Sequence, residues 1–269
     1  MASNALLHIV FTFQIIAILI FSVVATALFS RILYLYCCRR GSGLCVRCLS
    51  KCMISYMILN SIGLITAIPY YASKLPIFHQ PSSPELEFWL STIGMTDLGV
   101  MPLTVFFLAL ERCLAIQFRF SKKLEKIVFA SNLISVLAIT FTNFIVCSLG
   151  YRSSFLFVFK MVIGVLNIGA CAFLCWKVHH FKRNSKYNIS NTKNTIVKFT
   201  CISELILEFL PNLVATVIIM TVGRELFAYT GPFATTTQCL NVMICAIIYS
   251  KTLHSKNKSS TVVFTHSSK

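Results

Sequence analysis

Seven long apolar runs, separated by short polar segments, constrain this chain more than any other feature. About 20 helical residues cross a ~30 Å hydrocarbon core, so an apolar run of that length predicts one membrane-spanning helix. The runs cover residues 5–36, 53–71, 88–118, 127–149, 155–176, 196–222 and 226–249. We therefore predict an all-α integral membrane protein: a seven-transmembrane helix bundle forming one domain over residues 1–258, and a short tail over residues 259–269.

Composition supports the membrane class and argues against a nucleic-acid partner. Of the 269 residues, 57% are hydrophobic and only 12% are charged, whereas soluble domains carry roughly 25% charged residues. The formal net charge of +16 is not gathered on one stripe, as nucleic-acid binding would require. Twelve Cys are present, most of them in apolar runs, where free Cys acts as a small hydrophobe. The denser group at residues 37–52 lacks the paired spacing of a zinc site, so we predict reduced or palmitoylated thiols there and no metal.

The charges of the loops predict how the bundle is oriented. The N-terminus and the second, fourth and sixth loops hold only Lys74, Arg152 and Arg224. The other loops and the tail hold most of the basic residues: Arg39, Arg40, Arg47, Lys51, Arg119, Lys122, Lys123, Lys126, Lys182, Arg183, Lys186, Lys193, Lys251, Lys256 and Lys258. Because positively charged loops stay cytosolic, we predict that the N-terminus is outside and the C-terminus is cytosolic.

A charged pair, Glu111-Arg112, stands where the third apolar run ends. Charges in a lipid-compatible helix are costly, so they normally face the bundle interior or the membrane boundary. In a partly dehydrated pocket the carboxylate can hold the guanidinium until a partner competes for it. The alternative is an anchoring pair whose Arg reaches the lipid headgroups. In the sixth run, Pro211 follows Phe209-Leu210 and predicts a kinked helix that can act as a hinge.

Seven spans with Glu-Arg ending the third and Pro in the sixth resemble rhodopsin-like G-protein-coupled receptors. The stretch Ala109-Leu-Glu-Arg-Cys-Leu-Ala115 is similar to the Glu-Arg-x-x-Ala pattern of nematode serpentine chemoreceptors, class BC or a related class. The resemblance implies a chemosensory receptor in the plasma membrane or a sensory cilium that activates a heterotrimeric G protein through its cytoplasmic loops, and it leaves a receptor dimer open. It also implies activation-switch residues, which are Glu111, Arg112, Ala115, Pro211 and Tyr249.

The chain departs from that family at several places. Where the family has Asn-Pro-x-x-Tyr in the seventh span, only the Tyr is matched, in Cys245-Ala-Ile-Ile-Tyr249. The second span has Asn60 where an Asp is typical, and no Cys stands near the outer end of the third span for the usual external disulfide. These departures argue against a sodium pocket and against the standard rearrangement of the seventh helix.

Three carboxylates, Asp97, Glu204 and Glu208, fall inside apolar runs and must be paired, protonated or exposed to water. They either contact a ligand or join neighbouring helices through neutral hydrogen bonds. The resemblance implies a small, largely apolar ligand among spans three, five, six and seven, and we expect Asp97, Glu208 and Phe209 at its site.

Other functional classes fit less well. The last span has no Lys for a retinal Schiff base, and no catalytic constellation stands out. We therefore expect neither an enzyme nor a cofactor protein. An ion channel or transporter remains the alternative, because intramembrane carboxylates could line an ion path. The expected partners are a heterotrimeric G protein, a small-molecule ligand and membrane lipids.

Overall fold

The computed structural model describes residues 2–38, 49–75, 83–117, 122–148, 154–184, 191–222 and 232–263. Nearly all of these residues are helical, and none of them forms a strand. The helices are α1 (Ala2–Cys38), α2 (Lys51–Ala72), α3 (Pro84–Gln117), α4 (Lys122–Ser148), α5 (Ser154–Asn184), α6 (Asn191–Glu204), the π-helix η2 (Leu205–Phe209), α7 (Leu210–Val222) and α9 (Phe233–Val263). The predicted all-α class is confirmed.

Six of the described helices are long and apolar enough to cross a membrane: α1, α2, α3, α4, α5 and α9. Their outward faces carry bulky apolar side chains in the open, such as Phe13 at 71% exposed and Phe141 at 67% exposed. Polar side chains such as Asn132 and Asn143 are instead buried between helices. Large exposed apolar surfaces are rare on soluble monomers. The molecule is therefore an all-α protein of the multi-pass membrane type.

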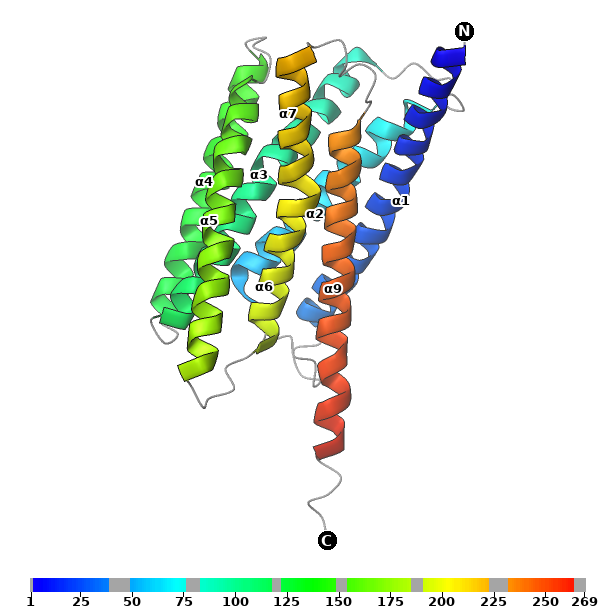
Figure 1. Ribbon diagram of the computed structural model, residues 1–269. Coiled ribbons are helices and arrows are strands. Elements are labelled where there is room, and N and C mark those ends of the chain that lie inside the picture. Colours follow the sequence, from blue (N-terminus) through cyan, green and yellow to red (C-terminus); the bar gives the residue numbers. More distant parts are fainter. Residues whose placement is uncertain are drawn as a thin grey trace.

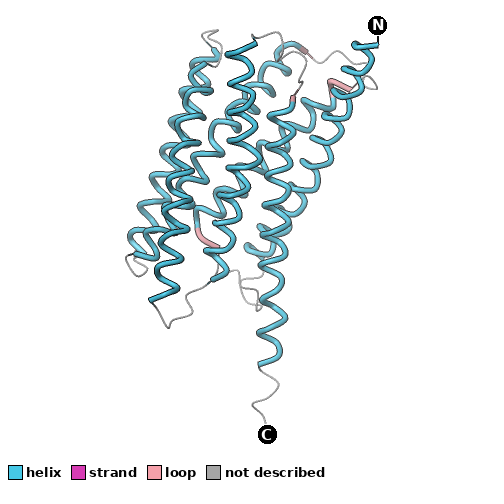
Figure 2. The backbone as a smooth tube through the Cα atoms, viewed as in Figure 1, coloured by secondary structure: helices cyan, strands magenta, loops and turns pink. Residues whose placement is uncertain are grey.

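The helices run alternately up and down the bundle, and the two termini lie at opposite ends (Figure 1). We call the end that holds the start of α1 the N-terminal end and the other the C-terminal end. Helix α3 crosses the middle and packs against α2, α4, α5 and α6, while α1 packs against α2 and α9. Beyond the bundle α9 continues as a helix to Val263 (Figure 2), past the predicted span end at residue 249 and into the predicted tail.

Some predicted features lie outside the described residues. They include part of the Cys-rich group, at residues 39–48, the turn at residues 150–153, residues 185–190 between α5 and α6, the start of the seventh run at residues 226–231, and the end of the tail at residues 264–269. The long extension of α9 has a simple cause. Apolar runs mark only the lipid-compatible part of a helix, whereas polar residues such as Lys251 and Lys256 are good helix formers that continue it.

The sixth apolar run is helical throughout, with α6 and α7 in line (Figure 1), but at its centre the π-helix Leu205–Phe209 interrupts the α-helical pattern. Pro211 has no backbone N–H, and in an α-helix its ring would clash with the carbonyl of residue 207. One wider π-turn, Leu205–Phe209, comes immediately before it, and the N–H of Leu210 bonds the carbonyl of Leu205, five residues back. The Asn212 side-chain amide donates to the Glu208 carbonyl. The proline is thus preceded by a wider turn, and Asn212 adds a side-chain bond to the backbone beside it.

At this interruption α5 approaches closely because it carries Gly164. A Cβ added at Gly164 would overlap the Phe209 ring, which lies against it. A Cβ added at Gly169, further along the same helix, would meet no atom within 4 Å. The two glycines therefore form a matched pair: only the first is required by packing.

We expect Gly164→Ala to lower the unfolding stability of the purified chain in detergent by about 1–3 kcal/mol, the usual cost of overpacking. Gly169→Ala should leave it unchanged or raise it. Adding Phe209→Leu to Gly164→Ala should recover much of the loss, because the smaller side chain makes room. Thermal unfolding measures all four proteins, and equal effects of the two glycine variants would contradict the packing described here.

Candidate functional site

The Glu111-Arg112 pair lies inside the bundle near the C-terminal end of α3. The two residues are 4% and 2% exposed, and the Arg112 guanidinium donates a hydrogen bond to the Glu111 carboxylate. The thiol of Cys52, at the start of α2, lies close enough to Glu111 for the carboxyl group to act on it electrostatically. This burial argues against the alternative in which Arg112 anchors the helix at the lipid headgroups, because an anchoring Arg extends to the membrane surface.

A pocket adjoins this pair between α3 and α4. It encloses about 300 Å³ of space not filled by atoms, open solvent included, and is lined by Glu111, Arg112, Leu114, Ala115, Leu124, Glu125 and Val128. Among the described residues, Arg112 Nε has no hydrogen-bond acceptor. The guanidinium is thus bonded on one side only, beside empty space at the end of the bundle. That arrangement can hold Arg112 in place while leaving it capable of accepting a further anionic or carbonyl partner.

Tyr249 is fully buried where four helices meet. Its ring packs against Phe29 of α1 and Tyr56 of α2, with ring centroids 6.2 and 6.1 Å apart. Its hydroxyl is 2.9 Å from Thr200 Oγ1 of α6. Tyr249 therefore ties α9 to the half of the interrupted helix that begins at the C-terminal end.

About two turns of α9 further into the bundle, Asn241 makes a second link between α9 and α6. Its side-chain amide donates to the Glu204 carboxylate at 2.8 Å, and its side-chain carbonyl accepts from Ser203. The Cys245 thiol also reaches this carbonyl, at 3.8 Å. Glu204 is thus part of a buried polar network at the last α-helical turn before η2.

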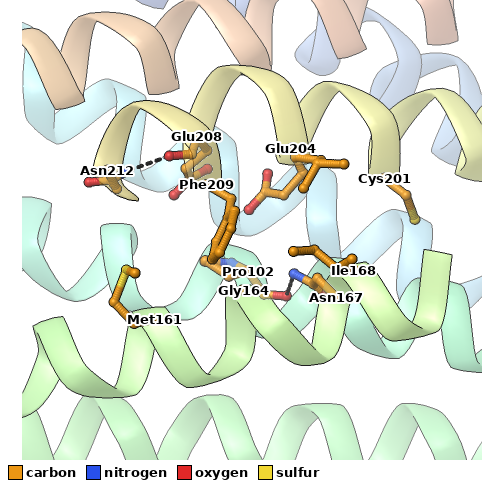
Figure 3. Close-up of a pocket in the computed structure, with 11 residues that line it drawn as sticks. Pro102, Met161, Gly164, Asn167, Ile168, Cys201, Glu204, Glu208, Phe209 and Asn212 are labelled. Carbon is orange, nitrogen blue, oxygen red and sulfur yellow. Dashed lines mark hydrogen bonds between the residues drawn. The ribbon is translucent and has the colours of Figure 1, made fainter. Parts of the chain in front are cut away.

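The interruption itself lines a pocket, here called the bend pocket (Figure 3). It encloses about 360 Å³ of space not filled by atoms, open solvent included, and its lining comes from α3, α5 and the interrupted helix: Pro102, Met161, Gly164, Asn167, Ile168, Cys201, Glu204, Leu205, Glu208, Phe209 and Asn212. Asn167 of α5 donates to the Pro102 carbonyl at 2.7 Å, which joins two of its walls. Five of these residues, 204, 205, 208, 209 and 212, span the π-turn.

The predicted ligand residues are divided between two pockets. Glu208 and Phe209 line the bend pocket. Asp97 instead lines a pocket between α2, α3 and α9 toward the N-terminal end, here called the Asp97 pocket. The structure therefore does not bring Asp97, Glu208 and Phe209 together in one site.

Several residues that carry the site were not selected from the sequence: Thr200, Ser203, Asn241, Cys52 and Asn167. Asn241 had a usable signal, because it is an amide in an apolar run eight residues, or about two helical turns, before Tyr249. Thr200 and Ser203 gave none, since Ser and Thr commonly bond their own helix backbone.

The chain matches no protein-family model, and no curated protein sequence is significantly similar to it. The site is therefore interpreted from its own geometry.

The buried pair has a sharp energetic consequence. Arg112→Met should destabilise the protein by about 3–5 kcal/mol, because it leaves the Glu111 carboxylate buried without its cation. Glu111→Leu/Arg112→Met removes both charges and should lose much less. The matched control is the half-exposed pair Lys74–Glu87, where Lys74→Met should lose less than about 1 kcal/mol. Denaturant unfolding in micelles measures the free energy of unfolding of each variant. A loss for Arg112→Met as small as that for Lys74→Met would contradict the account.

Proposed function

We propose that this chain is a seven-span chemosensory receptor that couples a small, largely apolar ligand to a heterotrimeric G protein at the plasma membrane. In this proposal the interrupted helix α6–η2–α7 crosses the membrane as the sixth of seven spans. The N-terminal end of the bundle faces outward and the C-terminal end faces the cytosol. The support comes from the alternating loop charges, the Glu111-Arg112 pair and the geometry of the interrupted helix.

The observation that carries the proposal is the coincidence of a pocket with a flexible point in a helix. The bend pocket is lined by the π-turn and by Asn212, the residue after Pro211. A ligand that enters it contacts the segment where the helix lacks regular α-helical hydrogen bonding. A bound ligand can therefore make better contacts with one bend angle of the helix than with another. Such a difference in contacts between two conformations is what a two-state receptor requires.

The C-terminal half of the bundle supplies a route from that bend to a cytosolic partner. Thr200–Tyr249 and Glu204–Asn241 tie α6 to α9, so a new bend angle must break or rearrange these bonds. The Glu111-Arg112 pair lies beside empty space at the same end of the bundle. We propose that release of Arg112 from Glu111 completes the surface that the G protein contacts. Ala115 lines the same pocket, and its small side chain leaves room beside Arg112.

The direct test is a ligand screen in cells that express the full chain, with calcium or cAMP imaging as readout. A volatile or otherwise small apolar compound should evoke a response that requires a G-protein α subunit. The double variant Glu111→Leu/Arg112→Met, if it reaches the surface, should give none. A full response of that variant at equal surface level would contradict the role of Arg112.

A basal-activity prediction follows from the pair. Glu111→Gln removes the negative charge and should weaken the pair by about 1–2 kcal/mol, which moves a two-state equilibrium by roughly 5–30-fold. Ligand-free signalling per receptor at the surface should therefore rise. Glu87→Gln, at the partly exposed pair with Lys74, is the control and should leave basal signalling unchanged. Unchanged or lower basal signalling in Glu111→Gln would argue against this arrangement.

The channel alternative depends on the intramembrane carboxylates. Glu204 and Glu208 are 3% and 2% exposed, and Glu204 is engaged by Asn241, which favours a structural hydrogen-bond network over an ion path. Patch-clamp recording without added G protein separates the two classes. A ligand-gated current whose reversal potential moves when Asp97, Glu204 and Glu208 are changed to Asn or Gln would replace the receptor proposal with a channel.

A further inference from the structure

Two buried thiols lie next to each other where α5 packs against α6. Cys171 of α5 is 8% exposed and Cys201 of α6 is 4% exposed, and both are free thiols. Each of them is the strongest single influence on the other, so the two side chains are direct neighbours. A buried free Cys usually serves only as a small hydrophobe, but two neighbouring thiols can also be joined by oxidation.

The register of the two helices places the thiols together independently. The helix α5 and the interrupted helix run in opposite directions (Figure 1), and Gly164 of α5 lies against the Phe209 ring. Cys171 comes seven residues after Gly164, which is about two helical turns. Cys201 comes eight residues before Phe209, and the wider π-turn accounts for the additional residue. The same two turns therefore bring Cys171 and Cys201 to one level of the bundle.

The bend pocket gives a small oxidant access to this pair. Cys201 lines the pocket together with Asn167 and Ile168 of α5, and its side chain points from α6 toward α5 (Figure 3). Cys171 follows Asn167 by four residues, so it continues the same face of α5. Hydrogen peroxide is neutral and small, so it can enter a polar cavity that admits water.

The surroundings of Cys171 favour reaction with a peroxide. Cys175, one helical turn further along α5, and the ammonium group of Lys198 on α6 both act electrostatically on Cys171. The thiolate is the form of Cys that attacks a peroxide, and a neighbouring cation stabilises it. This position thus combines a reactive environment with a second thiol close enough to complete a disulfide.

We propose that hydrogen peroxide converts Cys171 and Cys201 into a reversible disulfide between α5 and α6. The thiolate of one residue attacks the peroxide, whose O–O bond breaks. A sulfenic acid forms, and the departing hydroxide takes up the thiol proton to become water. The second thiol then attacks the sulfenic sulfur, so that the S–S bond forms and another water leaves. The two thiols together lose two electrons, and the peroxide gains them.

The disulfide fastens α6 to α5 beside the π-turn. Cys201 lies three residues before Glu204, the last residue of α6. The bond therefore holds two walls of the bend pocket at one separation and limits how far α6 can swing away from α5. If the chain is the receptor proposed above, its oxidised form responds less to a ligand. That consequence rests on the proposed function, whereas the disulfide itself does not.

Peptide mapping of the purified full chain in lipid nanodiscs tests the proposal. The reduced protein is exposed to hydrogen peroxide, quenched in acid, denatured and alkylated, and its Cys peptides are quantified by mass spectrometry. The Cys171 and Cys201 peptides should be recovered joined, with the loss of two hydrogen atoms, and dithiothreitol should restore both thiols. A main product that joins Cys171 to Cys175 or to Cys113, or no cross-link at Cys171, would overturn the proposal.

The same chain contains a matched control thiol, Cys239. It is 3% exposed and thus as buried as Cys201, but its sulfur accepts a hydrogen bond from the Ser22 hydroxyl at 3.7 Å. Its neighbour is therefore a hydroxyl group, which cannot complete a disulfide. Peroxide should remove the alkylable thiols of Cys171 and Cys201 at least ~10-fold faster than that of Cys239. Equal rates at the three positions would contradict a specific oxidation site.

Serine variants identify the two partners. Cys171→Ser and Cys201→Ser should each abolish the cross-linked peptide, and the remaining thiol should stop at a sulfenic acid that dimedone traps. Cys175→Ser keeps both partners and should keep the disulfide, so its loss there would contradict the pairing. The map of the unsubstituted chain decides the proposal even if a variant fails to fold. Because no arm measures signalling, a missing G-protein response leaves the disulfide standing, and a missing disulfide leaves the receptor proposal standing.

Discussion

The hydrocarbon core of a bilayer offers no hydrogen bonds, and this constraint determines how the helices of this bundle pack. Every polar side chain that points inward must find its partner on a neighbouring helix or on its own backbone. The pairs Thr200–Tyr249, Glu204–Asn241 and Asn167–Pro102 meet that requirement between α6 and α9 and between α5 and α3. Single bonds of this kind contribute only about 0.6–2 kcal/mol in membranes, so they align the helices while allowing rearrangement.

The lack of hydrogen-bond partners in the hydrocarbon core also affects the backbone at Pro211. A proline in a spanning helix leaves a carbonyl without its donor, and here a π-turn comes just before the proline while the Asn212 amide bonds the Glu208 carbonyl. The resulting local change of helical pitch lies beside Gly164, where α5 has no side chain to fill the space near Phe209. The bend pocket is therefore a consequence of how the proline is accommodated. It gives a ligand access to the part of the bundle with the least regular backbone bonding.

The sequence predicted those parts of the structure that depend on the average hydrophobicity of long stretches. Apolar runs predicted the helices, because the length of a hydrophobic stretch directly reflects a membrane crossing. The cost of the Glu111-Arg112 charges limited the pair to the bundle interior or the membrane boundary, and its burial favours the interior. The π-turn was not predicted, since a proline specifies that a helix must adjust and not how. The separation of Asp97 from Glu208 and Phe209 depends on helix rotation, which Gly63 and Gly164 influence through contacts with distant residues. The continuation of α9 to Val263 was not predicted, because hydropathy indicates which part of a helix can lie in lipid and not where the helix ends.

The receptor account depends first on topology, since every role assigned to Arg112, the bend pocket and the G-protein surface requires the C-terminal end of the bundle to face the cytosol. Epitope tags placed before Met1 and after Lys269 of the full chain, stained in intact and in permeabilised cells, measure this directly. The account predicts that the N-terminal tag is stained on intact cells and that the C-terminal tag requires permeabilisation. A C-terminal tag that is stained on intact cells would contradict it, because the Arg112 end of the bundle would then face away from any G protein.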